Sequence, residues 1–155
     1  MLFRSLGQSE APNLTRLLAD TNILKIYHFG RFDIAVLAKT FGVFSRSNYC
    51  TKIASKLTRT YTDRHGLKDL CRELLNIDLS KQQQSSDWAA ETLSEAQLAY
   101  AASDVLHLHA LKARLDMMLE REGRLDIASA CFNFLPDRAK LDLIGWPDKD
   151  IFSHE

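Results

Sequence analysis

Hydrophobic and polar positions along the chain change their period several times, and each change marks an expected element. Residues 2–6 are typical of a short strand, and Pro12 opens a short helix with leucines at helical spacing. Residues 23–29, ILKIYHF, are β-branched and aromatic and predict a buried strand. Gly30 breaks this strand, and the helix expected after it ends at Gly42.

The middle of the chain alternates between an ambiguous segment, a helix and a polar loop. Residues 49–57 begin like a strand and end like a helix, so the pattern leaves their class open. Residues 66–77 place leucines at helical spacing and predict an amphipathic helix. Residues 80–91 are polar and rich in glutamine, and Trp88 favours an ordered loop over a disordered one.

The second half of the chain is mostly helical by its pattern. Two overlapping capping boxes, Thr92 with Glu95 and Ser94 with Gln97, open a long helix. Gly123 is expected to close it, because glycine favours the left-handed backbone that ends helices.

The last part of the chain predicts a helix over 125–134 that Pro136 stops, followed by another over 137–144. Neither a repeat nor a second hydrophobic unit is visible, so residues 1–155 are expected to form one domain with a helical extension over 124–155. A strand followed by helices indicates the α/β class without fixing a topology.

Composition narrows the function less than the motifs do. The 155 residues include 20 Lys plus Arg and 20 Asp plus Glu, so the net charge is zero. This excludes a protein that binds nucleic acid by bulk positive charge, although a local basic groove remains compatible with it. We expect no membrane segment, because no apolar run is long enough. The three cysteines form no metal or redox motif, which favours a reduced, cytoplasmic protein.

Asp104 falls on the apolar side of the expected long helix, and Tyr100 lies one turn before it on the same side. The apolar stripe of this helix comprises Leu98, Ala101, Val105, Leu108, Leu111, Leu115 and Met118. A carboxylate there is costly unless a partner satisfies it. Two interpretations stay open: an arginine or backbone donor pairs with Asp104, or a divalent metal binds it while the tyrosine positions a water.

Asp33 follows the expected strand 23–29, after the glycine break and in the first turn of the next helix. One interpretation is a carboxylate that the helix dipole stabilises by about 0.5 kcal/mol. The other is a functional residue, because active sites in α/β folds gather at the carboxyl ends of strands. The two aspartates alone do not decide between these interpretations.

Three stretches resemble, in order, motifs of the ribonuclease D-like 3′-5′ exonucleases, in the tyrosine-containing branch of the DEDD superfamily. KIYHFGRFDIAVL is similar to the second exonuclease motif, with Asp33 as its aspartate. LSEAQLAYAASDVLHLHAL is similar to the third, with Tyr100 and Asp104 matching Y-x-x-x-D. Between them, residues 66–94 resemble the connecting segment, including its K-x-x-Q-x-S-D-W stretch. The similarity covers about residues 14–120.

This resemblance implies an RNase H-like fold with a mixed sheet flanked by helices. It implies removal of nucleotides from RNA 3′ ends, with single-stranded DNA as an alternative substrate. Two Mg²⁺ or Mn²⁺ ions, held by four carboxylates, would activate the attacking water and stabilise the leaving oxygen. In these terms Asp33 and Asp104 bind metal, and Tyr100 orients the water. The residues expected to contact the substrate are His28, Phe32, Lys81, Gln84 and Trp88.

The chain departs from the family at its start. The first motif, Asp-x-Glu, is expected before residue 14, where Glu10 is the only acid. We therefore expect an N-terminally incomplete fold with two of four metal-binding carboxylates and an exposed strand edge that favours self-association. The alternative hypothesis is a catalytically inactive remnant that binds nucleic acid or a protein partner. A thiol enzyme is disfavoured, because Cys71 lies in an amphipathic helix without a nearby histidine in sequence.

Residues 51–65 form the most basic and aromatic stretch of the chain. Lys52, Lys56, Arg59 and Arg64 would suit a groove wall that contacts phosphates. The same charges would equally suit a solvated surface. The sequence leaves both interpretations open.

Overall fold

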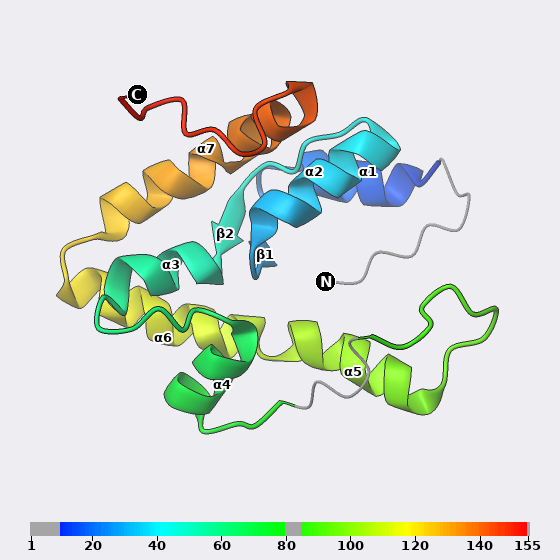
Figure 1. The fold of residues 1–155 in the computed structure, drawn as a ribbon, viewed down its shortest axis with the longest axis horizontal. Helices are drawn as coiled ribbons and strands as arrows, with labels where there is room; N and C mark the ends of the chain where they lie inside the picture. The colour runs from blue at the N-terminus through cyan, green and yellow to red at the C-terminus, as the bar shows by residue number, and fades with distance from the viewer. Residues whose placement is uncertain (1–9, 80–84, 155) are drawn as a thin grey trace.

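The computed structural model describes residues 10–79 and 85–154, which form helices around a small sheet (Figure 1). The expected strand over 2–6 lies outside the described residues. The elements, in chain order, are α1 (Pro12–Ala19), β1 (Lys25–Tyr27), α2 (Gly30–Phe41), β2 (Asn48–Cys50), α3 (Thr51–Thr58), α4 (Leu67–Leu75), α5 (Glu95–Leu106), α6 (Leu108–Arg121) and α7 (Leu125–Ile144).

The sheet of the described residues is a parallel pair, with Ile26 of β1 opposite Tyr49 of β2. Of the mixed sheet that the sequence predicts, the described residues thus contain one parallel pair. β1 covers only three residues of the expected strand 23–29, and Ile23 and Leu24 ahead of it are exposed. The ambiguous stretch 49–57 contains both a strand and a helix, because β2 passes directly into α3 at Thr51.

The core lies between the sheet and the long helices. α2 packs on α7, and α3 packs on α6. Leucines of α6 face β1, α3 and α4 and are almost fully buried, as periodicity predicts for that helix. The buried cluster comprises Tyr27, Ile34, Tyr49, Cys50, Ala54, Leu70, Cys71, Leu111, Leu115, Leu119, Ala128, Phe132, Leu135 and Ala139.

Several helix ends confirm the sequence predictions. Pro12 occupies the first turn of α1, where its missing N–H costs nothing. α2 ends at Gly42, which adopts the left-handed conformation with φ 69°. Ser94 and Gln97 form the predicted capping box at the start of α5.

The prediction of one long helix from residue 92 to Gly123 is wrong. The helix breaks at His107, whose ψ of −2° departs from helical geometry, so that α5 and α6 are separate. α5 extends beyond the packed body of the molecule (Figure 1). Only the α6 half of the predicted apolar stripe is therefore buried, while Leu98 and Val105 on α5 are exposed.

The prediction that Pro136 separates two helices is also wrong, because α7 runs through it without interruption. Proline removes one backbone hydrogen bond and crowds the preceding turn, which costs about 3 kcal/mol in a helix interior. Phe132, Leu135 and Ala139 are buried on either side of it. Their packing holds the helix together across the proline.

Candidate functional site

A cleft of about 290 Å³ opens where the end of β1, the first turn of α2, the start of α4 and α5 meet. It brings together residues that are far apart in the chain. Its walls include His28, Asp33, Tyr100 and Asp104, all of which the sequence singles out. The remaining lining residues are Ile26, Tyr27, Gly66, Leu67, Lys68, Asp69, Leu79, Val105 and Leu108.

The turn between β1 and α2 places Asp33 in this cleft. Gly30 sits so close to β1 that a Cβ atom on it would lie 2.9 Å from the Cβ of Tyr27. Phe29, just before it, adopts the left-handed conformation with φ 65°, which is unusual for a residue with a side chain. This tight turn starts α2 at once and leaves Asp33 in the first helical turn with only 5% of its surface exposed.

The two aspartates share an electrostatic environment that opposes their ionisation. Burial, with a smaller contribution from the negative charge of Asp104, raises the pKa of Asp33 to about 6. Burial also raises the pKa of Asp104. Two carboxylates that resist ionisation in one cleft are suited to a cation, because a positive charge between them would relieve both effects.

Tyr100 lies one turn before Asp104 on α5 and lines the same cleft. Burial and the Asp104 charge raise the pKa of its phenol, which therefore stays protonated at neutral pH in the metal-free protein. Its ring packs against Trp88 at a centroid distance of 5.9 Å. Trp88 thus anchors the preceding loop on α5, as the sequence predicts.

Hydrogen bonds from the buried side chain of Gln97 hold the loop that precedes α5. The Gln97 side-chain amide donates to the carbonyl of Asp87 at 2.9 Å and contacts Ser86 Oγ at 3.1 Å. The same side chain closes the capping box with Ser94. These contacts hold residues 86–97 together as one unit that carries Tyr100 and Asp104 on its next two turns.

His28 lines the cleft at the carboxyl end of β1. Its Nδ1 lies 3.0 Å from the hydroxyl of Thr51, which in turn donates to the carbonyl of Tyr27 at 3.2 Å. Burial and the nearby charge of Lys52 lower the pKa of His28 to about 4, so the imidazole is neutral at pH 7. A neutral, oriented ring suits hydrogen bonding to a ligand better than it suits acid catalysis.

Two exposed phenylalanines lie at the turn between β1 and α2 that carries Asp33. Phe32 is 53% exposed and Phe29 is 46% exposed, and the ammonium of Lys52 lies 4.6 Å from the centre of the Phe29 ring. Exposed aromatic faces with a nearby cation are a common arrangement for binding nucleobases and phosphates. The other two expected substrate contacts, Lys81 and Gln84, lie outside the described residues.

Two charged residues of the cleft, Lys68 and Asp69, were not singled out from the sequence. Asp69 lies in the first turn of α4, and its Oδ2 is 3.1 Å from the position that a Cβ on Gly66 would take. An acid three residues after a helix-opening glycine is typical of an N-terminal cap, so its sequence signal resembles that of a structural residue. Its place in the cleft depends on how α4 packs.

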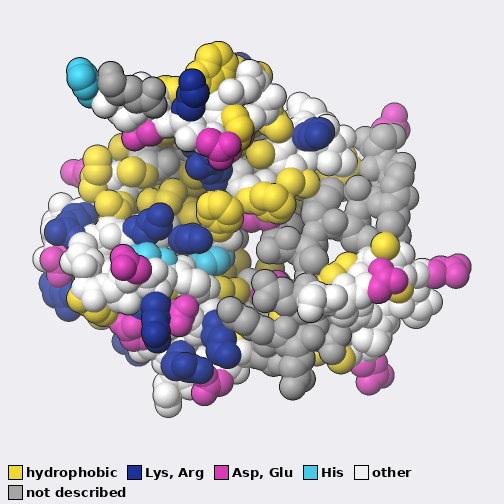
Figure 2. All heavy atoms as spheres, in the orientation of Figure 1, with side chains coloured by type: hydrophobic (Ala, Val, Ile, Leu, Met, Phe, Trp, Pro, Cys, Tyr) yellow, Lys and Arg dark blue, Asp and Glu magenta, His cyan; other side chains and the backbone are white. Residues whose placement is uncertain are grey.

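The basic residues of 51–65 differ in whether they could contact phosphates. Arg59 is 1% exposed, and its guanidinium is held by Glu73 and by the carbonyl of Arg64. It is a structural residue and is not available to phosphate. Lys52 remains on the surface beside Phe29, and Figure 2 shows further Lys and Arg side chains over α3 and α4 on this face.

Within the part of the chain that the structure describes, no group of three or more His, Cys, Asp or Glu side chains could hold a metal ion. Asp33 and Asp104 fit a divalent cation in charge and chemistry, since Mg²⁺ and Mn²⁺ prefer carboxylate oxygens. They would supply two of the ligands of such a site.

Comparison with known proteins gives the family of the chain. The family model described as 3′-5′ exonuclease matches residues 2–120. Ribonuclease D of Gluconacetobacter diazotrophicus is 37% identical over 123 residues, which are 79% of this chain and 31% of that protein. The chain thus spans about a third of the length of this relative.

Solved structures give the same result. Brucella melitensis NrnC is 66% identical, with a TM-score of 0.93 over 96% of this chain and 72% of that chain. Escherichia coli RNase D is 28% identical, with a TM-score of 0.74 over 87% of this chain and 36% of that chain. The expected α/β fold of the RNase H-like class is thereby confirmed, and the chain belongs to the 3′-5′ exonuclease family.

Proposed function

We propose that the cleft is the site of a 3′-5′ exonuclease that hydrolyses phosphodiester bonds at RNA 3′ ends with two divalent metal ions. The observation that carries this proposal is the pair Asp33 and Asp104, which line one cleft and whose pKa values are both raised. A structural ion pair would require a cation near Asp104. None of the described ion pairs includes Asp33 or Asp104, which supports the metal interpretation.

Asp33 and Asp104 would hold Mg²⁺ or Mn²⁺, which supplies Lewis-acid stabilisation of charge on the phosphate oxygens. Tyr100 would orient the attacking water through its protonated hydroxyl. The two further carboxylates that the family resemblance implies belong to the Asp-x-Glu motif, which the described residues of the cleft do not match; the other carboxylate of the cleft is Asp69. The proposal therefore assigns this chain the tyrosine and two of the four carboxylates.

The substrate is proposed to be short RNA, with single-stranded DNA as an alternative. Brucella melitensis NrnC has been solved bound to pGG, and it is 65% identical in that structure. The exposed rings of Phe29 and Phe32 suit two stacked bases beside the cleft, and His28 and Trp88 lie close to it. Lys81 and Gln84 stay proposed contacts on the resemblance alone. A cytoplasmic location is part of the proposal, because RNA is the proposed substrate. Separately, none of the helices in the described residues is long and apolar enough to cross a membrane.

The test is a cleavage assay on 3′-labelled RNA and on pGG with Mn²⁺ or Mg²⁺. It compares this chain with a version extended upstream by an Asp-x-Glu segment, and each with its Asp104→Asn variant. Stepwise shortening from the 3′ end that requires metal and is lost in Asp104→Asn supports the proposal. Metal-independent cleavage, or activity of the extended chain that survives Asp104→Asn, would falsify it.

A second candidate is a catalytically inactive remnant that binds nucleic acid or a protein partner. It is favoured because the described residues contain no group of three or more His, Cys, Asp or Glu side chains that could hold a metal ion, whereas hard divalent cations need about six oxygen ligands. An upstream-extended chain that binds pGG but never cleaves it, at any Mn²⁺ concentration, would support this alternative.

A further inference from the structure

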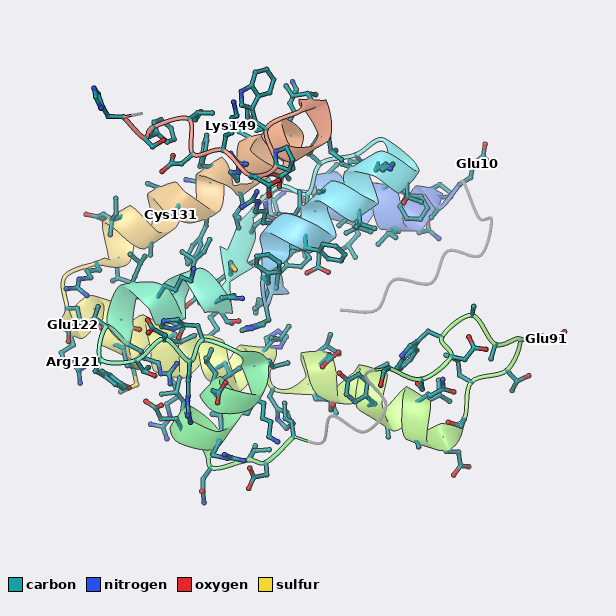
Figure 3. All side chains as sticks on the ribbon, in the orientation of Figure 1. Glu10, Glu91, Arg121, Glu122, Cys131 and Lys149 are labelled. Carbon is teal, nitrogen blue, oxygen red and sulfur yellow. The ribbon has the colours of Figure 1, made fainter. Side chains whose placement is uncertain are left out.

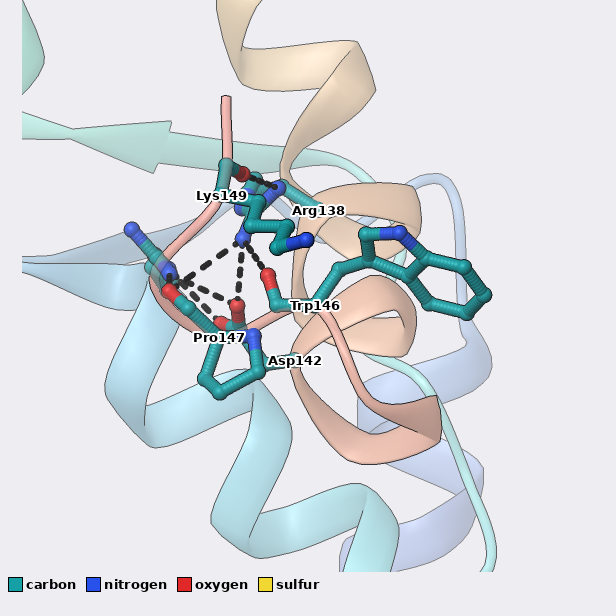
Figure 4. Close-up of polar contacts among 6 residues, drawn as sticks. Arg138, Asp142, Trp146, Pro147 and Lys149 are labelled. Carbon is teal, nitrogen blue, oxygen red and sulfur yellow. Dashed lines mark hydrogen bonds and ion pairs between the residues drawn. The ribbon is translucent and has the colours of Figure 1, made fainter. Parts of the chain in front are cut away.

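A polar clasp joins the start of α2 to the end of α7 (Figure 4). Asp142, near the end of α7, accepts hydrogen bonds from two guanidinium groups. Arg31 on α2 donates to both carboxylate oxygens, with Nε and Nη2 each at 2.7 Å. Arg138, one turn earlier on α7, donates to Oδ1 at 2.8 Å. Forked, charge-assisted contacts of this kind are the stronger and more directional hydrogen bonds.

The same two arginines hold the tail that follows α7. Arg31 donates to the carbonyl of Pro147, and Arg138 donates to the carbonyls of Trp146 and, at 3.2 Å, of Lys149. The tail is thereby folded back beside α7, where Lys149 lies in Figure 3. The clasp, defined as Arg31, Arg138 and Asp142, therefore links α2, α7 and the tail.

The clasp is more than an isolated surface ion pair. Arg138 and Asp142 are each 16% exposed, and Arg31 is 35% exposed. The hydrogen bond from Arg31, with a further contribution from Arg138, lowers the pKa of Asp142, so its carboxylate is ionised at neutral pH. Single exposed pairs contribute little, but a forked network with shared partners holds a defined geometry.

The clasp acts on the helical turn that carries Asp33. Arg31 lies two residues before Asp33 at the start of α2. Toward β1 this turn is fixed by the contact of Gly30 with Tyr27. On the side of α7 it is fixed by the clasp. A groove of about 460 Å³ lies between α2 and the end of α7, and its walls include Phe29, Arg31, Phe32 and Asp142.

We propose that Arg31, Arg138 and Asp142 are positioning residues for the proposed exonuclease site. They touch neither the metal-binding carboxylates nor the cleft. They set where the first turn of α2 stands, and with it Asp33 and the exposed Phe29 and Phe32. This inference rests on the proposed function, and it assigns the end of α7 a role in catalysis without contact with the reacting atoms.

The experiment uses the 155-residue chain and its Asp142→Asn variant, in which both arginines lose their anionic partner. Amide hydrogen exchange over residues 32–36 reports the α2 turn directly, and a Mn²⁺ titration followed by electron paramagnetic resonance reports the metal site. We expect faster exchange and Mn²⁺ binding weakened about tenfold, as for other residues that orient metal ligands. Asp142→Glu keeps the charge and should restore most of both values. Asp78→Asn, which removes the exposed partner of Arg72 on α4, is the matched control.

The outcomes separate the clasp from the metal site. Unchanged exchange over 32–36 in Asp142→Asn overturns the positioning role, and so does a lowered Tm with unchanged exchange and Mn²⁺ affinity. If Asp33→Asn binds Mn²⁺ as well as the unaltered chain does, the proposed function fails instead. The exchange measurement then still decides whether the clasp positions the turn.

Discussion

Asp33 and Asp104 face one cleft from two helices, α2 and α5, and the charge of Asp104 adds to burial in raising the pKa of Asp33 to about 6. The two residues are thus coupled before any ligand is bound. Charge repulsion of this kind is relieved by a cation or by a proton. The coupling makes the behaviour of one aspartate measurable through the other.

The first prediction follows from that coupling. Asp104→Asn removes the charge and should lower the pKa of Asp33 toward its ordinary range, while burial keeps it above 3.8. Carboxyl-carbon NMR across a pH titration measures this directly. Asp69→Asn, which removes another carboxylate of the cleft, is the control. An Asp33 titration that is identical with and without Asp104 would contradict the shared site.

The second prediction concerns stability against pH. The folded protein holds the Asp33 proton up to about pH 6, whereas the unfolded chain releases it near 3.8, so stability falls as pH rises between these values. Asp33→Asn should therefore stabilise the metal-free protein by roughly 3 kcal/mol at pH 7.5 and hardly at all at pH 3.5. Urea unfolding at both pH values gives the two differences. A stabilisation that does not depend on pH would rule out this cause.

The third prediction separates metal binding from water positioning. Tyr100→Phe removes only the hydroxyl, so Mn²⁺ affinity should stay unchanged while cleavage by an active, upstream-extended chain slows by about 10²-fold. The ring contact with Trp88 remains possible for phenylalanine, which keeps the loop in place. Single-turnover rates and a Mn²⁺ titration on the same protein test this. Equal losses in both would show that Tyr100 supports the structure of the site instead.

The fourth prediction concerns the left-handed residue at the turn. A left-handed conformation costs a residue with a side chain about 1–2 kcal/mol, which glycine avoids. Phe29→Gly relieves this cost but also loses the half of the ring surface that is buried, so the stability should change by less than about 1 kcal/mol in either direction. The affinity for pGG should fall. Calorimetry of pGG binding checks this, with Phe134→Ala on α7 as the control for loss of an exposed ring. Unchanged affinity would remove Phe29 from the substrate surface.

The fifth prediction concerns the edge of the sheet. Among the described residues, β1 has a strand partner only on the side of β2. An open strand edge favours pairing with another chain. We expect the 155-residue chain to associate as its concentration rises, which sedimentation velocity over a dilution series detects. A single monomeric species throughout would show that the edge is covered in solution.

Local patterns predict the part of the fold that carries Asp33. Nearest neighbours in the sequence determine the strand before Gly30 and the helix up to Gly42. The structure places the helix as expected, and it forms the strand over Lys25–Tyr27 of the expected 23–29. The Y-x-x-x-D spacing likewise places Tyr100 and Asp104 on one side of a helix without tertiary information. Their meeting with Asp33 came from the family resemblance, because spacing within each segment says nothing about distance between segments.

The features that sequence reasoning missed depend on packing. The residues around His107 have ordinary helical propensity, so the break between α5 and α6 reflects where the core ends. Pro136 normally stops a helix, yet buried neighbours on both sides keep α7 continuous. Arginine is usually a surface residue, yet Arg59 is almost fully buried and paired with Glu73. In each case tertiary contacts override a local preference.

The close approach of Gly30 to Tyr27 limits how this protein can be engineered. A library that varies Phe29 and Phe32 to probe their proposed base contacts can sample many side chains, because about half of each side chain is exposed to solvent. Position 30, in contrast, has no room for a side chain. Even alanine would drive a methyl group against the tyrosine and push the following helix outward. Any redesign of the proposed substrate surface therefore has to keep glycine at this position.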